Sequence, residues 1–325
     1  MRLKLMKKQN LSNKRILVTG ISGFAASHLA RKLLKEGNEV HGTMRVRSNL
    51  SKIEDIKDKL HLHLIELTDP FIVENVINEV KPDEIYHLAA QSYVKLSWDA
   101  PIETYNINIA GTINLFEAVK KLKLDSRILV TSTSEIYGEI DGDINEDTVP
   151  NPITHYGISK YAQDMIARLY ARSFGMKVVI TRAFNITGPG RGEVFVDSSF
   201  AKQIADIEKG KEPLIEHGNL ESERDFISIH DVIDGYVKAL RSERWGEVFC
   251  LGSGKPVKIK DLLNSLIKLS THKGIKTRVD KKRLRPTDTK TMKCDYSKAK
   301  GVLGWQPKVP LEESLLELLN YWRND

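Results

Sequence analysis

The chain has 325 residues, of which 41% are hydrophobic and 29% are charged, and it carries a formal net charge of +7. This is the composition of a globular protein, long enough for one large domain or two closely packed ones. No apolar run approaches the length of a membrane span, and the basic residues are spread along the chain without a nucleic-acid-binding module. We therefore expect neither a membrane nor a nucleic-acid partner, and an anionic small substrate explains the basic excess equally well.

The two cysteines, Cys250 and Cys294, lack the spacing of a metal site. We interpret them as unpaired thiols of a reducing cytoplasm, and we predict no bound metal. The first ten residues are basic but lack the long apolar core of a signal peptide, which also favours a cytoplasmic location.

The start of the chain predicts a dinucleotide site. An apolar strand over residues 15–19 leads directly into a turn that contains Gly20 and Gly23, and a helix follows from about residue 25 to 36. Gly20 permits the tight turn, and Gly23 allows backbone amides to approach a pyrophosphate at the positive end of the helix. The order of strand, glycine turn and helix is what makes a short glycine motif informative.

The next strand, residues 39–43, indicates which dinucleotide is bound. A site for NAD usually has Asp or Glu at the end of this strand, to bind the ribose 2′-hydroxyl. Here Arg45 and Arg47 follow instead, and two guanidinium groups favour a 2′-phosphate. We therefore predict NADP, with NAD as the less favoured cofactor; the alternative is that both arginines are solvated surface residues.

Strands and helices then alternate along the chain. This pattern predicts an α/β fold, with a Rossmann-type doubly wound parallel sheet whose ligands lie beyond the carboxyl ends of the strands. We predict strands over residues 61–65, 84–90, 127–131 and 177–181, and helices over residues 69–80, 104–121 and 156–174.

Hydroxyl groups and one carboxylate follow the strand that ends at residue 131. Tyr156 and Lys160 lie four residues apart in a predicted helix and so share one face of it. A buried ammonium group beside a phenol favours the phenolate, so we expect Lys160 to lower the pKa of Tyr156. Tyr156 is then a candidate proton acceptor for an alcohol that loses a hydride. A Tyr-x-x-x-Lys pair also arises by chance, but here it accompanies a dinucleotide fingerprint.

The pattern loosens after Arg182. We predict a loop over residues 185–192, helices over residues 198–209, 229–240, 258–270 and 311–322, and strands that begin at residue 223, span 247–251 and lie near 275. We expect residues 1–183 to form the NADP-binding domain, with residues 229–251 returning to it. Residues 184–325 would form a smaller C-terminal α/β lobe for the substrate, and the two lobes would share one cleft.

Together these motifs resemble the extended short-chain dehydrogenase/reductase superfamily over about residues 14–323. The resemblance rests on TGxxGxxA, Ala89-Ala90, Tyr156-x-x-x-Lys160, Arg224-Asp225-Phe226 and Arg285-Pro286. Residues 40–48, 90–94 and 132–138 are similar to GDP-mannose 4,6-dehydratase, whereas residues 184–190, 199–204 and 218–226 look more like its sister family, GDP-4-keto-6-deoxymannose reductase. The chain departs from the dehydratase pattern at Phe24-Ala25-Ala26 and at Glu66, where Asp is usual.

The resemblance implies an NADP-dependent nucleotide-sugar 4,6-dehydratase, a lyase that converts a GDP-linked hexose or heptose to its 4-keto-6-deoxy form. Tyr156 would take the C4 hydroxyl proton, Thr133 would hydrogen-bond O4, Glu135 would act as acid and base at C5 and C6, and Lys160 would hold the nicotinamide ribose. Glu135 permits dehydration without requiring it. An NADPH-dependent GDP-4-keto-6-deoxy-sugar reductase, a nucleotide-sugar epimerase and a non-catalytic NADP-binding scaffold stay open.

The same resemblance assigns the remaining site residues. The predicted cofactor-binding residues are Gly20, Ser22, Gly23, Phe24, Arg45, Arg47, Leu67, Leu88, Ala89, Ala90, Tyr156 and Lys160. The predicted substrate-binding residues are Ser92, Ser134, Asn185, Arg191, Val194, Arg224 and Arg285. The resemblance also implies a homodimer in which helices 104–121 and 156–174 pair, or a homotetramer supported by the Arg45/Arg47 loop.

Overall fold

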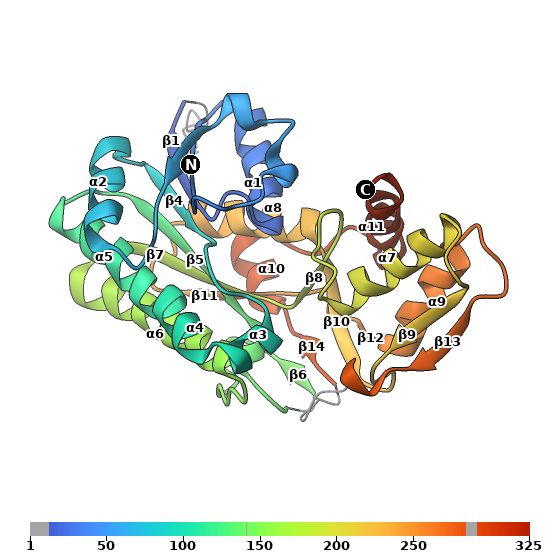
Figure 1. Ribbon diagram of the computed structural model, residues 1–325. Helices are drawn as coiled ribbons and strands as arrows, with labels where there is room; N and C mark the ends of the chain where they lie inside the picture. Colours follow the sequence, from blue (N-terminus) through green and yellow to red (C-terminus); the bar gives the residue numbers. More distant parts are fainter. Residues whose placement is uncertain (1–12, 141, 284–290) are drawn as a thin grey trace, which may run out of the picture.

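The computed structural model describes residues 13–140, 142–283 and 291–325. Its central element is a parallel sheet with the strand order β11-β7-β5-β4-β1-β2-β3 (Figure 1), which confirms the predicted Rossmann-type sheet. The strands are β1 (Arg15–Thr19), β2 (Glu39–Met44), β3 (His61–Leu64), β4 (Glu84–His87), β5 (Arg127–Thr133), β7 (Lys177–Ala183) and β11 (Val248–Leu251).

Helices cover both faces of this sheet because its central strands are apolar on both faces. Ile16 and Val18 of β1 pack into the core beneath α1 and α8, while Leu17 between them packs beneath α2, α5 and α6. Successive side chains of a strand point to opposite faces, so one apolar run serves both cores. The helices are α1 (Phe24–Lys35), α8 (Ile229–Arg241), α2 (Pro70–Val80), α5 (Gly111–Lys121) and α6 (His155–Phe174).

The helix expected over residues 104–121 begins slightly earlier, at Pro101, and contains a π-helical turn. It consists of α4 (Pro101–Tyr105), a π-helical turn (Asn106–Ala110) and α5, and an unpredicted helix, α3 (Val94–Asp99), precedes it. Asn108 lies in the π-helical turn, and its Oδ1 accepts a hydrogen bond from the backbone N–H of Gln91 at 2.8 Å. Its Nδ2 donates to Ser159 Oγ at 2.9 Å. The widened turn therefore connects the segment after β4 to α6, a role typical of π-bulges near functional sites.

A smaller lobe has a core of its own, built from α7, α9 and α11 (Figure 1). Residues 185–187 were expected in a loop, but they form a strand because they pair in parallel with residues 226–228. The elements of this lobe are α7 (Val196–Glu208), β9 (Leu214–His217), β10 (Glu223–Ser228), β12 (Pro256–Lys258), α9 (Ile259–Leu269), β13 (Lys276–Val279), β8 (Asn185–Thr187) and α11 (Leu311–Asn324).

Several later segments return to the first lobe. α8 lies against α1, and β11 pairs with β7 at the edge of the sheet. Beyond the expected 229–251 segment, β14 (Lys293–Cys294) pairs with β6 (Asp143–Ile144), and α10 (Ser297–Leu303) leads to Trp305 in the same core as α8. Residues 293–305, which the sequence assigns to the second lobe, thus contact the first.

Cys250 and Cys294 are free thiols, as predicted, and both are buried. None of the helices in the described ranges is long and apolar enough to span a membrane.

Candidate active site

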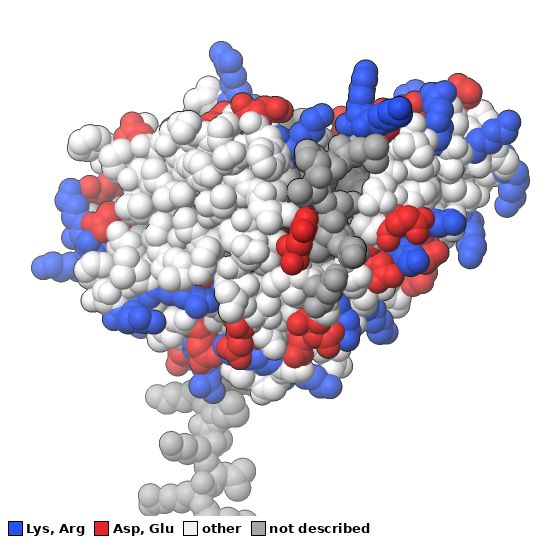
Figure 2. Space-filling model, turned by 90° about the horizontal axis from the view of Figure 1, so that it is seen from below, with Lys and Arg blue, Asp and Glu red and all other residues white. Residues whose placement is uncertain are grey.

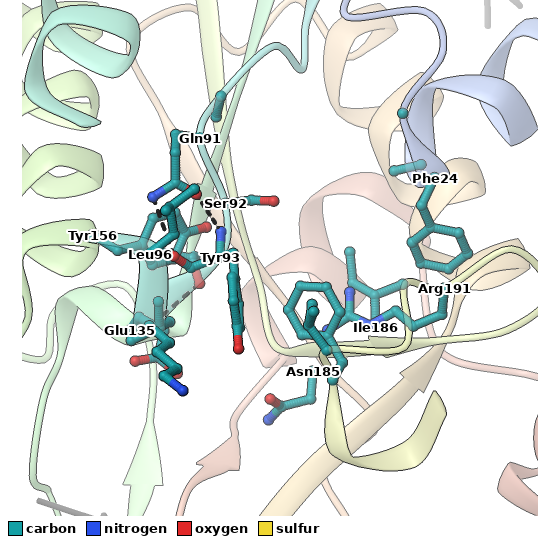
Figure 3. Close-up of a pocket in the computed structure, with 18 of the residues that line it drawn as sticks. Phe24, Gln91, Ser92, Tyr93, Leu96, Glu135, Tyr156, Asn185, Ile186 and Arg191 are labelled. Carbon is teal, nitrogen blue, oxygen red and sulfur yellow. Dashed lines mark hydrogen bonds between the residues drawn. The ribbon is translucent and has the colours of Figure 1, made fainter. Parts of the chain in front are cut away.

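A cavity of about 1200 Å³ opens between the two lobes, at the carboxyl ends of β1, β4 and β5. The chain leaves β1 toward β2 and β3 on one side, and β4 begins the other half of the sheet on the opposite side of β1. The resulting crevice between β1 and β4 is the usual ligand position of an open parallel sheet. In Figure 3, Ser92, Tyr93, Glu135 and Tyr156 lie on one side of the space, opposite Phe24, Asn185 and Arg191.

The glycine turn lies at one end of this cavity. Gly20 has a φ of +71°, and a Cβ atom there would lie 3.0 Å from the Cα of Ala89, so the turn requires glycine. Gly23 is the N-cap of α1 and makes no side-chain capping hydrogen bond, which leaves the helix end suited to a phosphate. The predicted cofactor-binding residues near this turn all line the cavity, namely Gly20, Ser22, Gly23, Phe24, Leu67, Leu88, Ala89 and Ala90.

The two arginines after β2 differ in position. Arg45 lines the cavity, together with Ser48 and Glu66, whereas Arg47 is exposed and is not part of the lining. Arg45 alone is therefore placed to meet a phosphate on an adenosine ribose. With the glycine turn, these residues fit a dinucleotide that carries a 2′-phosphate.

The catalytic candidates lie where β5 ends. Thr133 is the last residue of β5, and Glu135 lies in a 3₁₀ turn, Ser134–Ile136. The hydroxyl of Thr133 accepts a hydrogen bond from the backbone N–H of Glu135 at 3.3 Å. Both residues line the cavity. Thr133 does so from the end of the strand, and Glu135 from the turn that follows it.

The expected effect of Lys160 on Tyr156 is wrong for this structure. Burial raises the pKa of the Tyr156 phenol, the charge of Glu135 raises it further, and a hydrogen bond with Thr133 opposes both effects. The Lys160 ammonium instead donates hydrogen bonds to the backbone carbonyl of Thr131 at 2.5 Å and to the side-chain carbonyl of Gln163. Because the lysine points toward β5, its charge does not act on the phenol. Burial lowers the pKa of Lys160 to about 7.

The small lobe contributes the opposite wall. The guanidinium of Arg191 lies 3.6 Å from the ring centre of Phe195 and 5.6 Å from that of Phe24. Its Nε is buried and has no hydrogen-bond partner, and neither has Oδ2 of the neighbouring Asp197. A buried donor without a partner in the protein is available to a ligand in the cavity. Anionic oxygens suit a guanidinium best.

The other predicted substrate-binding residues lie around Arg191 or across the cavity from it. Asn185, Val194 and Arg224 line the small-lobe side, while Ser92 and Ser134 line the side of the large sheet. Arg285 lies outside the described residues.

Several lining residues escaped the sequence analysis. The rings of Tyr93 and Phe195 come from different lobes and lie edge to face, 6.3 Å apart between their centres, near Arg191. Tyr93 lies in the 90–94 segment that resembles the dehydratase, but no local pattern predicts its contact with Phe195, because the contact forms only when the lobes meet. Lys282 and Arg283 also line the cavity. They precede Arg285 in one short basic run, and that proximity was the available signal.

Three histidines lie together away from this cavity. His41 of β2 stacks on His61 and His63 of β3, and its Nδ1 lies 3.0 Å from Nε2 of His63. Within the described ranges, no group of three or more His, Cys, Asp or Glu side chains could hold a metal ion. Tyr137 is a packing residue, whose buried hydroxyl donates to the backbone carbonyl of Asn145 at 2.7 Å.

Known proteins confirm the resemblance seen in the sequence. A family model described as GDP-mannose 4,6 dehydratase matches residues 17–318. The chain is 32% identical to the GDP-mannose 4,6-dehydratase of Yersinia enterocolitica, covering 94% of this chain and 93% of that protein. It is also 28% identical to the GDP-6-deoxy-D-mannose reductase of Pseudomonas aeruginosa, covering 95% and 97%.

Solved structures agree in fold. The RMD protein of Pseudomonas aeruginosa, solved with NADPH, superposes with a TM-score of 0.84 at 28% identity, over 96% of this chain and 99% of that one. The UDP-glucose 4-epimerase of Thermotoga maritima, solved with UDP-glucose, gives a TM-score of 0.85 at 30% identity, over 95% and 98%. The chain therefore belongs to the GDP-mannose 4,6-dehydratase family of the extended short-chain dehydrogenase/reductases.

Proposed function

We propose that the protein is an NADP-dependent nucleotide-sugar 4,6-dehydratase, which converts GDP-mannose or a close GDP-linked relative to the 4-keto-6-deoxy sugar. The observation that carries this proposal is the position of Glu135 beside Tyr156 in one cavity wall, close enough for the carboxylate charge to raise the pKa of the phenol. Dehydration needs two proton-transfer groups, one for the C4 hydroxyl and one for the C5 proton and the leaving oxygen.

NADP fits the glycine end of the cavity. Gly20, Gly23 and the uncapped end of α1 would hold the pyrophosphate, and Arg45 would meet the 2′-phosphate. The RMD structure with NADPH supports this choice, although the Thermus thermophilus UDP-glucose 4-epimerase was solved with NAD at a TM-score of 0.84. When bound, NADP supplies the capacity to accept a hydride from C4 and to return it at C6.

The chain's own residues would manage the protons. Tyr156 would exchange the proton of the C4 hydroxyl, and the hydroxyl of Thr133, already hydrogen-bonded to Tyr156, would support the phenolate. Glu135 would take the C5 proton and protonate the C6 oxygen as it leaves as water. On the small-lobe side, Arg191 and Arg224 would bind the diphosphate through their guanidinium groups.

A reductase is the second candidate. The alignment with the Pseudomonas aeruginosa reductase covers 95% of this chain and 97% of that protein, and residues 184–190, 199–204 and 218–226 resemble its family. A 4-keto reductase needs Tyr156 as an acid, but hydride transfer to C4 leaves the C5–H bond intact, so Glu135 would be dispensable. An epimerase is less favoured for the same reason. A non-catalytic scaffold would have no chemical need for Thr133, Tyr156 and Lys160 in one cavity.

The test is to incubate the purified protein with GDP-mannose and a catalytic amount of NADP, and to follow product mass and the absorbance of reduced nicotinamide. Loss of one water with no net change of cofactor redox state supports the dehydratase. NADPH consumption with the 4-keto-6-deoxy sugar nucleotide, and no reaction with GDP-mannose, supports the reductase. Turnover of neither substrate contradicts both. The Y156F variant is the control for contaminating activity.

We also propose a homodimer. α6 presents Ile158, Met165 and Leu169 to solvent, and Trp98 and Ile102 extend this apolar face across α3 and α4. Figure 2 shows a broad region of the same side without charged residues. A second copy of the chain would cover this face with its own identical apolar face, as in a two-fold symmetric dimer. No residue of α5 belongs to the large exposed apolar residues, so the dimer would use α4 and α6. The Arg45/Arg47 loop stays a proposed contact of a tetramer.

The proposed location is the cytoplasm. Cys250 and Cys294 are buried, free thiols in the same apolar cluster, which suits a reducing compartment.

A further inference from the structure

Lys160 is only 3% exposed, so the surroundings of its ammonium group decide its charge. One acceptor is the backbone carbonyl of Thr131, near the end of β5. The other is the side-chain carbonyl of Gln163, which lies one turn further along α6 and is completely buried. Residues three apart on a helix are neighbours, so Gln163 is placed to contact this lysine whatever ligand is bound.

Hydrogen bonds on the far side of Gln163 determine which way its amide faces. Nε2 of Gln163 donates to Thr112 Oγ1 of α5 at 2.6 Å. The Thr112 hydroxyl already donates its own proton to the backbone carbonyl of Asn108 at 2.7 Å. It therefore has no proton left for Gln163 and must accept from it. The amide is held with its nitrogen toward Thr112 and its oxygen toward Lys160.

The same reasoning extends through His87 to Thr19, the last residue of β1, and to the backbone that follows β4. Thr112 Oγ1 also lies 2.9 Å from Nε2 of His87, so His87 must donate from Nε2. Nδ1 of His87 then accepts from the hydroxyl of Thr19, at 2.9 Å. Thr19 Oγ1 in turn accepts from the backbone N–H groups of Leu88 and Ala89, at 3.1 and 3.0 Å. His87 is fully buried, and burial lowers its pKa to about 3, so it stays neutral.

We propose that Gln163 is a positioning residue, whose carbonyl holds Lys160 as an ammonium ion at the end of β5 and whose amide nitrogen connects this lysine through Thr112 and His87 to Thr19 and the segment after β4. An acceptor that cannot donate stabilises the protonated lysine more than the neutral amine, because a hydrogen bond from a charged donor is stronger. The orientation of Lys160 and the position of Leu88 and Ala89, which line the cavity after β4, therefore depend on one buried chain of hydrogen bonds. The proposal rests on the proposed function only for the catalytic role of Lys160.

Within the described part of the chain, one charged group acts on Lys160, namely Asp164 of α6, whose carboxylate favours the ammonium form and is itself held by Arg182 and Arg168. Tyr156 on α6 and His87 on β4 are neutral, and α5 contributes the uncharged Thr112. Beyond the end of β5, Glu135 acts on Tyr156. Gln163 is thus the side-chain acceptor whose replacement isolates the effect.

The test is a direct titration of Lys160 in the full chain without substrate. The protein is produced with ¹³C-labelled lysine, the Lys160 signal is assigned with the K160R variant, and its chemical shift is followed against pH. In Q163M the acceptor is lost at similar side-chain volume, and we expect the midpoint to fall by about one pH unit. In Q163E the added carboxylate should raise the midpoint by about one pH unit.

Unchanged midpoints in both variants overturn the proposal, and if Q163M does not fold, an unchanged or lowered midpoint in Q163E overturns it. Q203M is the matched control, because Gln203 is also held at both ends of its amide, by the backbone of Glu216, but in the small lobe. It should leave the Lys160 midpoint unchanged.

Once turnover is established, the alkaline limb of its pH profile should move down in Q163M and up in Q163E, whereas a merely structural role would leave the limb in place. Midpoints that shift as expected without turnover on any nucleotide sugar would contradict the proposed function and leave this inference standing.

Discussion

The guanidinium group of Arg191 lies 3.6 Å from the ring centre of Phe195, and this cation–π contact holds the guanidinium in the small-lobe wall of the cavity. Phe24, from the end of the glycine turn, lies on the same guanidinium at 5.6 Å. Arg191 thus contacts both lobes at once. The planar guanidinium is needed for stacking on the rings, and its buried Nε is available to donate to a ligand.

Replacing Arg191 with lysine should therefore weaken nucleotide binding although the charge is kept. Lysine can neither stack on Phe195 nor donate two parallel hydrogen bonds, so we expect about a tenfold loss of affinity or more. The measurement is calorimetric titration with GDP and with UDP. R278K is the matched control, because Arg278 is exposed on β13 and binds Glu216. Wild-type affinity in R191K would exclude Arg191 from diphosphate binding.

Replacing Glu135 with glutamine should abolish dehydration and leave NADP binding intact. The amide keeps the size and the polarity of the side chain but cannot remove the C5 proton, so turnover should fall by at least about 10²-fold. Product mass measures the loss, and calorimetry measures NADP affinity. E139Q is the control, since Glu139 is a nearby exposed glutamate. Full activity in E135Q would remove this carboxylate from the mechanism.

Replacing Arg45 and Arg47 together with alanine should weaken NADP more than NAD, because only NADP carries the 2′-phosphate. The single variants divide the effect: R45A should lose about tenfold in NADP affinity, and R47A should lose little, since Arg47 is outside the cavity lining. Calorimetric or fluorescence titration with each cofactor tests this. Equal losses for the two cofactors would refute the 2′-phosphate assignment.

The ion pair between Glu208 and Arg323 should make stability depend on pH. Arg323 of α11 binds both carboxylate oxygens of Glu208, at 2.7 and 2.9 Å, and lowers the pKa of this carboxyl from 4.5 to about 2. A carboxyl with a lowered pKa stabilises the fold above its unfolded pKa, and this contribution is lost as the pH falls from about 4.5 to about 2.

We therefore expect R323M to reduce the free energy of unfolding by about 1–3 kcal/mol at pH 7, and by progressively less below pH ~4.5. Urea unfolding at pH 7, 4 and 3 measures the difference. R278M removes the more exposed pair with Glu216 and should cost less. A difference between wild type and R323M that does not change with pH would contradict the assignment.

Charging the apolar face of α6 should dissociate the proposed dimer. Met165 and Leu169 are 46% and 53% exposed, one turn apart, so the double variant M165K/L169K places two ammonium groups in the interface. Sedimentation velocity should show dimers for the wild type and monomers for the variant. F71K, at a 76% exposed phenylalanine on α2, is the control and should stay dimeric. A monomeric wild-type protein would reject the interface.

Much of the fold was predictable because its patterns are local. The apolar strands at 15–19, 84–87 and 127–133 and the glycine turn after the first are short continuous stretches. Residues 185–187 were missed because their pairing partner, residues 226–228, lies some forty positions later. α3 was missed for a related reason: the position of the segment after β4 depends on Asn108 in the π-helical turn.

The candidate site divides in the same way. Sequence alone determined which residue types gather at the strand ends, from Gly20 to Thr133, Glu135, Tyr156 and Lys160, because the carboxyl ends of parallel strands meet at one edge. Only the tertiary structure decided what each group contacts. Lys160 donates to Thr131 and Gln163, and the pKa of Tyr156 is raised. Arg45 lines the cavity, whereas Arg47 does not. Burial and hydrogen-bond partners come from distant segments, and these, rather than the residue type, set the charge and direction of a side chain.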